Sequence, residues 1–225
     1  MQKPLAVRWL GRVPYRQGLR LQERLVASRR KGETPDTLLL LEHPPVITLG
    51  RGADPANVRI SPRALRARRI ELHETGRGGD VTFHGPGQLV GYPIVALAAG
   101  RRDAHRYLRD LEEALILTAA DYGVVATRIA GLTGIWAEGK KLGAIGVRIS
   151  TGWITSHGFA LNVSTDLRDF ETIIPCGIAG RSVTSLFELT GRSFSLPEVA
   201  ARAAQKTAEV LGYTPRLETG VQCHA

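Results

Sequence analysis

Apolar residues recur at three- and four-residue steps in two long segments, and this spacing predicts amphipathic helices. The first helix is expected over residues 15–30, between Pro14 and Gly32. The second is expected over residues 103–122, where Gly123 ends the pattern. Both segments carry polar residues between the apolar positions, so each helix should cover a core with one face.

Two further helices are predicted from their start signals. Ser61 and Pro62 can serve as N-cap and first helical residue of a short basic helix that runs to about residue 69. Residues 195–198, Ser-Leu-Pro-Glu, have the form of a capping box and should open a last helix that ends near residue 211.

Short apolar runs bounded by glycine, proline and polar residues predict strands. They cover residues 5–10, 37–42, 46–49, 80–83, 89–95, 124–129, 142–149 and 153–163. Because the strands come in runs with helices around them, we expect an α+β fold with a mixed or antiparallel sheet and flanking helices.

Composition excludes several classes of protein. Hydrophobic residues make up 43% of the 225 residues and charged residues 23%, which is too apolar for a disordered chain. No run approaches the roughly 18 to 20 apolar residues of a membrane span, and the N-terminus lacks the apolar core of a signal peptide. A cytoplasmic protein is therefore expected. Two cysteines make neither a disulfide scaffold nor, alone, a zinc site.

The net charge of +9 arises from 25 arginines and only 5 lysines against 21 acidic residues. Such a balance predicts acidic partners, which could be nucleic acid, an anionic membrane or an acidic protein. Aromatic residues make up only 6% and do not interleave with the basic ones, which disfavours single-stranded nucleic acid.

Residues 76–88 form the first segment with distinctive chemistry. Six of its thirteen residues are glycine or proline, and Arg77, Thr82, His84 and Gln88 supply polar groups at close spacing. Glycines let backbone amides approach a ligand, although neither nucleotide-binding glycine motif is present. The residues alone leave open a plain glycine-rich hairpin in which His84 is a hydrogen-bonded core residue.

Lys140 and Lys141 stand side by side before an apolar strand in a chain that otherwise uses arginine. A lysine can give up its proton where an arginine cannot, so one of the pair is a candidate base. Two surface lysines on a turn are the alternative interpretation.

Cys176 lies between Pro175 and Gly177, at the end of an apolar stretch. The Cys176 thiolate could act as a nucleophile toward an acyl group, and the unobstructed Gly177 N–H could donate to the resulting oxyanion. The alternative interpretation is a buried cysteine with no chemical role. His157, Gly158 and Asn162 lie in one predicted strand. Gly158 could let the backbone approach a ligand, with Asn162 as a polar contact. The alternative is an ordinary strand in which His157 is exposed to solvent.

Four of these segments together resemble the lipoyl(octanoyl) transferase family. The similar motifs are RGGDVTFHGPGQLVGY at residues 77–92, GKKLGAIG at 139–146, HGFALNV at 157–163 and PCG at 175–177. Their order and spacing are also similar, over about residues 5–212.

The resemblance implies a fold like that of biotin and lipoate protein ligases, in one catalytic domain over residues 1–225 with a flexible tail at 213–225. It implies octanoyl transfer through a thioester on Cys176, with Lys141 beside the thiol. It also implies an acyl pocket lined by Arg77, Gly78, Gly79, Asp80, Val81, Thr82, Phe83, His84, Ala144, Ile145, Gly146, Gly158, Phe159 and Ala160.

The same resemblance implies the partners. The donor would be acyl carrier protein, and the acceptors would be lysines of the lipoyl domains of 2-oxoacid dehydrogenases and of the glycine cleavage H protein. No ATP and no metal should be needed, because thioester exchange is nearly isoenergetic and amide formation is downhill. We expect a monomer that binds neither nucleic acid nor membrane.

Three other functions each fit part of the sequence. An adenylating lipoate or biotin ligase has the same fold but no use for a cysteine nucleophile. A nucleic-acid-binding protein explains the charge but not Cys176 and Lys141. A cysteine hydrolase would need a Cys-His-Asn order that the chain does not show, since Cys176 follows the candidate histidines.

Overall fold

The computed structural model describes residues 3–174 and 182–218, so the expected nucleophile Cys176 lies outside the described residues. Five α-helices are present in this part of the chain: α1 (Tyr15–Lys31), α2 (Pro62–Arg68), α3 (Ala104–Ala120), α4 (Leu186–Thr190) and α5 (Leu196–Leu211). Three short 3-10 helices accompany them: η1 (Pro55–Asn57), η2 (Ala99–Arg101) and η3 (Leu167–Thr172).

The strands form two sheets. The larger has the order β11-β1-β2-β6-β10-β9-β8-β7, and the smaller has the order β4-β3-β5. The bounds are β1 (Lys3–Arg12), β2 (Thr37–Glu42), β3 (Val46–Leu49), β4 (Glu71–Glu74), β5 (Val81–His84), β6 (Gln88–Ile94), β7 (Thr127–Ile129), β8 (Leu132–Ala137), β9 (Lys140–Ser150), β10 (Ile154–Asn162) and β11 (Tyr213–Leu217).

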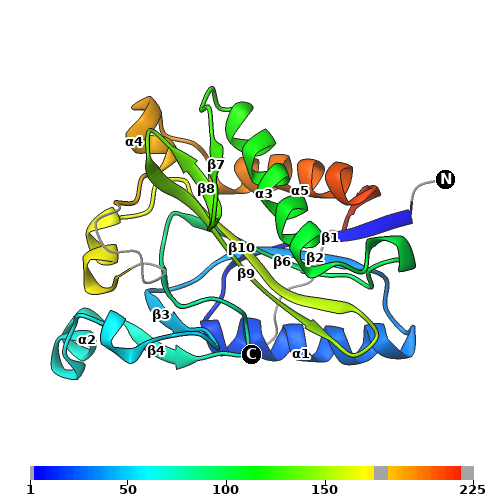
Figure 1. Ribbon diagram of the computed structural model, residues 1–225, viewed down its shortest axis with the longest axis horizontal. Helices are drawn as coiled ribbons and strands as arrows, with labels where there is room; N and C mark the ends of the chain where they lie inside the picture. The colour runs from blue at the N-terminus through cyan, green and yellow to red at the C-terminus, as the bar shows by residue number, and fades with distance from the viewer. Residues whose placement is uncertain (1–2, 175–181, 219–225) are drawn as a thin grey trace.

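The large sheet is mixed, as expected. β1 pairs in parallel with both β2 and β11, whereas the pairs from β2 through β6, β10, β9, β8 and β7 are antiparallel. Helices α3 and α5 lie on one face of this sheet and α1 lies on the other (Figure 1). The architecture is therefore three layers, with the small sheet beside the α1 layer.

The hydrophobic core has two main parts that follow these layers. Leu111 and Leu115 of α3, with Ala203 and Ala204 of α5, pack on the large sheet and are almost fully buried. Leu25 of α1 packs on the opposite face. None of the helices in the described part of the chain has the length and apolar composition needed to span a bilayer.

The expected helices are confirmed within two residues at each end. Ser61 caps α2 by accepting a hydrogen bond from the Ala64 N–H, as its position before proline predicts. Ser195 precedes α5 as expected, but its side chain makes no capping hydrogen bond, so the capping box is not formed. The strand expected from residue 124 begins only at Thr127.

The tail expected from residue 213 is wrong in its first five residues. Gly212 adopts the left-handed conformation after α5 and reverses the chain, and β11 then pairs with β1 from Lys3 to Val7. The Tyr213 hydroxyl donates a hydrogen bond to Asp36 at 2.9 Å. A parallel pairing with a distant strand leaves no local periodicity, which explains why β11 was not predicted.

Candidate functional site

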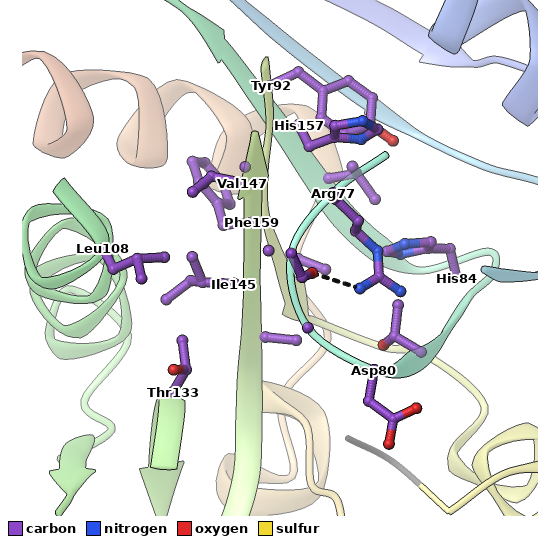
Figure 2. Close-up of a pocket in the computed structure, with 18 of the residues that line it drawn as sticks. Arg77, Asp80, His84, Tyr92, Leu108, Thr133, Ile145, Val147, His157 and Phe159 are labelled. Atoms are coloured by element: carbon purple, nitrogen blue, oxygen red, sulfur yellow. Dashed lines mark hydrogen bonds between the residues drawn. The ribbon is translucent and has the colours of Figure 1, made fainter. Parts of the chain in front are cut away.

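A cavity of about 520 Å³ lies around the middle of β9 and β10, with Leu108 of α3 on one side of β9 and Arg77 and His84 on the other (Figure 2). β9 and β10 supply its central wall. The residues after β4 supply a second wall, and Leu108 of α3 with Leu132 and Thr133 of β8 close a third side. The cavity is lined by Tyr15, Arg77, Gly78, Gly79, Asp80, Val81, Thr82, His84, Val90, Tyr92, Ala104, Leu108, Gly131, Leu132, Thr133, Ala144, Ile145, Gly146, Val147, Ile149, His157, Gly158, Phe159 and Ala160.

The structure brings thirteen of the fourteen expected pocket residues together at this one cavity. Residues 77–82, His84, 144–146 and 158–160 all line it. Phe83 is the exception and corrects the sequence expectation. Its side chain is fully buried in a separate apolar cluster, where its ring meets the Phe170 ring edge-on at 5.5 Å.

Arg77 holds the glycine-rich loop in place from within. Its Nη2 donates to the carbonyl oxygen of Thr48 at 2.7 Å and to the Thr48 hydroxyl at 2.9 Å, and its Nη1 donates to the Gly78 carbonyl oxygen at 3.0 Å. The Gly78 N–H donates to the Val147 carbonyl oxygen at 2.9 Å, which ties the loop to β9. The loop therefore forms a fixed wall of the cavity, with Arg77 pointing inward from it (Figure 2).

Glycine is needed where this loop meets its neighbours. A Cβ on Gly50 would lie 2.2 Å from the Gly79 carbonyl oxygen, and a Cβ on Gly146 would lie 3.0 Å from the Gly78 carbonyl oxygen. Two backbones thus approach each other more closely than a side chain would permit.

A hydrogen-bonded chain of buried side chains leads from the cavity toward β9. The Gln88 amide Nε2 donates to Asn162 Oδ1 at 2.9 Å, so Gln88 Oε1 is left to accept from His84 Nδ1 at 2.7 Å. Asn162 Nδ2 in turn donates to the Thr184 carbonyl oxygen at 2.9 Å. This assignment makes His84 a neutral imidazole with its lone pair on Nε2.

Burial accounts for the neutral state of the histidines in this region. Desolvation, with the nearby His43, lowers the pKa of His84 to about 3. Desolvation and the cations Arg77 and Arg148 lower the pKa of His157 to about 4. The expected alternative of an exposed His157 is wrong, since it is 4% exposed.

His43 was not predicted as part of this region. It is fully buried, its Nδ1 donates to the Val13 carbonyl oxygen at 2.6 Å, and its Nε2 accepts from the Tyr92 hydroxyl at 2.7 Å. Tyr92 lines the cavity, so His43 supports the cavity wall from behind. A histidine directly before two prolines carries no spacing signal that could have identified this contact.

The structure distinguishes the two lysines. Lys140 is exposed, whereas Lys141 is 6% exposed and its Nζ lies 5.2 Å from the centre of the Trp136 ring. Lys141 also lines a small cavity whose wall shares Thr82, Ala144 and Ala160 with the large one. Lys141 thus stands at the edge of the main cavity, behind three of its lining residues.

Backbone hydrogen bonds hold the described residues on either side of residues 175–181. The Ile174 N–H donates to the Asn57 carbonyl oxygen at 2.7 Å. On the other side, the Lys141 N–H donates to the Ser182 carbonyl oxygen at 3.0 Å, and the Thr184 N–H donates back to the Lys141 carbonyl oxygen at 2.9 Å. Among the described residues, no three His, Cys, Asp or Glu side chains gather where they could hold a metal ion.

Comparison with solved structures identifies the fold. A bipartite lipoate protein ligase from Thermoplasma acidophilum matches with a TM-score of 0.71 at 16% identity, covering 97% of this chain and 88% of that one. A lipoate-protein ligase A bound with ATP matches with a TM-score of 0.70 at 17% identity, over 97% and 90%. The expected α+β fold of the lipoate and biotin ligases is therefore confirmed.

Comparison of the sequence identifies the family. The model of the lipoyl protein ligase A/B catalytic domain matches residues 14–208. An octanoyltransferase from Acidobacterium capsulatum is 53% identical over 91% of this chain and 89% of its own length. One from Rubrobacter xylanophilus is 53% identical over 90% and 91%. The chain belongs to the octanoyltransferase family.

Proposed function

We propose that this protein transfers an octanoyl group from octanoyl-acyl carrier protein to a lysine of a lipoyl domain, through a thioester on Cys176. The observation that carries the proposal is the position of Lys141. It is buried beside a cavity that can hold an acyl chain, and its backbone pairs with residues that directly follow the segment containing Cys176.

In the first step, the Lys141 amine takes the proton of the Cys176 thiol. The thiolate attacks the thioester carbonyl of the donor, and the bond from the carbonyl carbon to the pantetheine sulfur breaks. Lys141 returns its proton to the departing pantetheine thiolate. The products are octanoyl-Cys176 and a free carrier thiol, so every atom and proton is accounted for.

In the second step, the amine of the acceptor lysine attacks octanoyl-Cys176. Its nitrogen loses a proton to Lys141, the carbon–sulfur bond breaks, and the proton passes to the Cys176 sulfur. The N–H of Gly177, which directly follows Cys176 in the sequence, is the proposed donor to the oxyanion of each tetrahedral intermediate. The result is an amide and a regenerated thiol.

The apolar part of the cavity suits the acyl chain. Leu108 of α3, with Ile145 and Val147 of β9, lines it on one side of β9 (Figure 2). Transfer of an octanoyl tail from water to such a site is worth about 0.8 kcal/mol per methylene, or about 5 kcal/mol for the whole tail. This binding energy can hold the carbonyl carbon in place while the carrier arm leaves and the acceptor lysine arrives.

In this proposal the reaction uses neither nucleotide nor metal, because both substrates of the chemical steps are already activated or nucleophilic. An adenylating ligase on the same fold is the competing function. Its mechanism gives no role to the Pro175-Cys176-Gly177 motif, which favours the transferase.

One assay distinguishes the octanoyltransferase from the adenylating ligase. The purified protein is incubated with octanoyl-acyl carrier protein and a lipoyl domain without nucleotide, and in parallel with free octanoate, ATP and Mg²⁺. We expect the octanoyl amide, detected as a mass shift of the lipoyl domain, only in the incubation with octanoyl-acyl carrier protein. Modification from free octanoate and ATP, retained after Cys176→Ala, would instead establish an adenylating ligase.

A further inference from the structure

The segment around α2 carries a dense group of exposed positive charges. Residues 51–70 contain six arginines and one acidic residue, Asp54, so they supply +5 of the total +9. We call these six side chains the arginine patch. All six are exposed: Arg51, Arg59, Arg63, Arg66, Arg68 and Arg69.

The arginine patch is poorly neutralised within the described chain. Only Arg68 has a carboxylate of the described residues within 4 Å, that of Asp169 at 3.9 Å. Arginines elsewhere are commonly paired: Arg101 with Asp110 at 3.0 Å, and Arg128 with Glu112 at 3.0 Å. Like charges held together repel one another, so such a cluster is best explained by an acidic partner outside the chain.

The arginine patch is attached directly to the functional site. The Arg59 N–H donates to the Thr172 carbonyl oxygen at 2.8 Å, next to the Ile174–Asn57 bond at the edge of the described chain. Asn57 Nδ2 donates to Asp80 Oδ2 at 2.6 Å, and Asp80 lines the cavity. In Figure 1, α2 lies at one end of the molecule, close to the yellow η3 segment.

We propose that the arginine patch, which includes Arg59 and Arg63, is the docking surface for the acidic carrier protein that delivers the octanoyl thioester. This inference rests on the proposed function. A carrier must place its thioester at the cavity, and a basic surface joined to both the cavity loop and the chain leading to Cys176 would orient it there. Opposite charges across such an interface speed encounter and fix orientation, and added salt weakens them.

The test compares two double charge reversals. Arg59→Glu with Arg63→Glu changes the patch. Arg192→Glu with Arg202→Glu makes the same change of net charge on exposed residues near α4 and in α5, neither of which lines the cavity. Circular dichroism and thermal unfolding establish that both proteins are folded. Kinetics are then measured with octanoyl-acyl carrier protein and with octanoyl-pantetheine, a thioester without an acidic protein.

We expect the patch variant to raise KM for octanoyl-acyl carrier protein at least tenfold, with octanoyl-pantetheine kinetics changed less than twofold. The control variant should change neither by more than twofold. Increasing NaCl should raise the wild-type KM for the carrier and have a weaker effect on the patch variant. Arg59→Gln with Arg63→Gln should give an intermediate KM.

Several results would overturn the docking surface. If the patch variant lost equal activity with octanoyl-acyl carrier protein and with octanoyl-pantetheine, the arginines would contribute to folding or to the chemical steps and not to carrier docking. If the patch variant raised only the KM for the lipoyl domain, the patch would be the docking surface for the acceptor. If the wild type bound RNA and the patch variant did not, with the KM for the carrier unchanged, the patch would be a nucleic-acid-binding surface. If the wild type transferred octanoyl from neither thioester, the proposed function itself would be wrong, which is a different outcome.

Discussion

His84 Nδ1 donates a hydrogen bond to Gln88 Oε1 at 2.7 Å, and this contact fixes the orientation of an imidazole that links the cavity wall to the strand of Lys141. The link continues through Asn162 to the Thr184 carbonyl oxygen, while the Thr184 N–H binds the Lys141 carbonyl oxygen. Because all these groups are buried, removal of any member leaves its neighbours without water to replace it.

Gln88→Ala should therefore destabilise the protein by about 1–3 kcal/mol, since the His84 N–H and Asn162 Oδ1 lose their partner. Octanoyl transfer should fall as well, because the His84 ring is no longer held. Urea unfolding and steady-state kinetics measure the two effects. Gln17→Ala, at an exposed position of α1, is the control and should change neither. Unchanged stability of Gln88→Ala would contradict the hydrogen-bond chain.

Lys141→Arg should abolish transfer from octanoyl-acyl carrier protein, because a guanidinium keeps the charge but cannot exchange a proton at usable pH. The neighbouring Lys140→Arg is the matched control, since Lys140 is exposed, and it should retain activity within about twofold. Initial rates of lipoyl-domain modification measure both. Similar rates for the two variants would mean that Lys141 is not the proton carrier.

Acid should destabilise the fold through the buried histidines. The pKa values of His43, His84 and His157 are lowered to about 4, 3 and 4, chiefly by burial. The unfolded chain therefore binds more protons than the folded one below about pH 6.5, and stability falls as the pH drops from there toward 4. At about pH 5 the free energy of unfolding should be lower than at neutral pH by about 2 kcal/mol for each of these histidines.

Urea unfolding of His43→Gln at neutral pH and near pH 5 checks the sign. The variant loses the bonds to Val13 and Tyr92 and should be less stable at neutral pH, but its stability should depend less on pH. His105→Gln, at an exposed position, should keep the wild-type dependence. An unaltered pH dependence in His43→Gln would show that His43 does not contribute.

Gly91→Ala should destabilise the antiparallel pairing of β6 with β10, in which Gly91 lies opposite Phe159. A Cβ there would lie 2.1 Å from Cζ of Phe159, a cavity-lining ring, so either the ring or the strand must move. Such overpacking costs about 1–3 kcal/mol. Thermal unfolding measures it, with Gly100→Ala as the control because no atom lies within 4 Å of a Cβ at Gly100. Equal melting temperatures for both variants would contradict the close approach.

Local pattern in the sequence was enough to predict most of the fold. Helix α1 carries apolar residues at helical spacing, and β2 and β3 have the predicted bounds because both are short apolar runs with clear turn residues around them. β4 (Glu71–Glu74) was not predicted, because its Glu-Leu-His-Glu sequence has no strand character. It is held by parallel pairing with β3, which is a tertiary contact.

The candidate site was predicted best where motifs are continuous. Residues 144–146 and 158–160 line the cavity because β9 pairs with β10, and residues 77–82 reach it because the Gly78 N–H binds the Val147 carbonyl oxygen of β9. Leu108 lies in the helix predicted over residues 103–122, but nothing in the local sequence shows that this helix begins beside a cavity. Phe83 was placed in the pocket by its neighbours in the motif, whereas its ring fills the core beside Phe170.

The proposed thioester on Cys176 is tested most directly by trapping the covalent intermediate. The protein is incubated with octanoyl-acyl carrier protein without acceptor, and the trapped adduct is mapped by mass spectrometry before and after hydroxylamine treatment. We expect one octanoyl group on Cys176, released by hydroxylamine, present in Cys223→Ala and lost in Cys176→Ala. An octanoyl label on another residue, or transfer to the lipoyl domain by Cys176→Ala, would contradict the thioester mechanism.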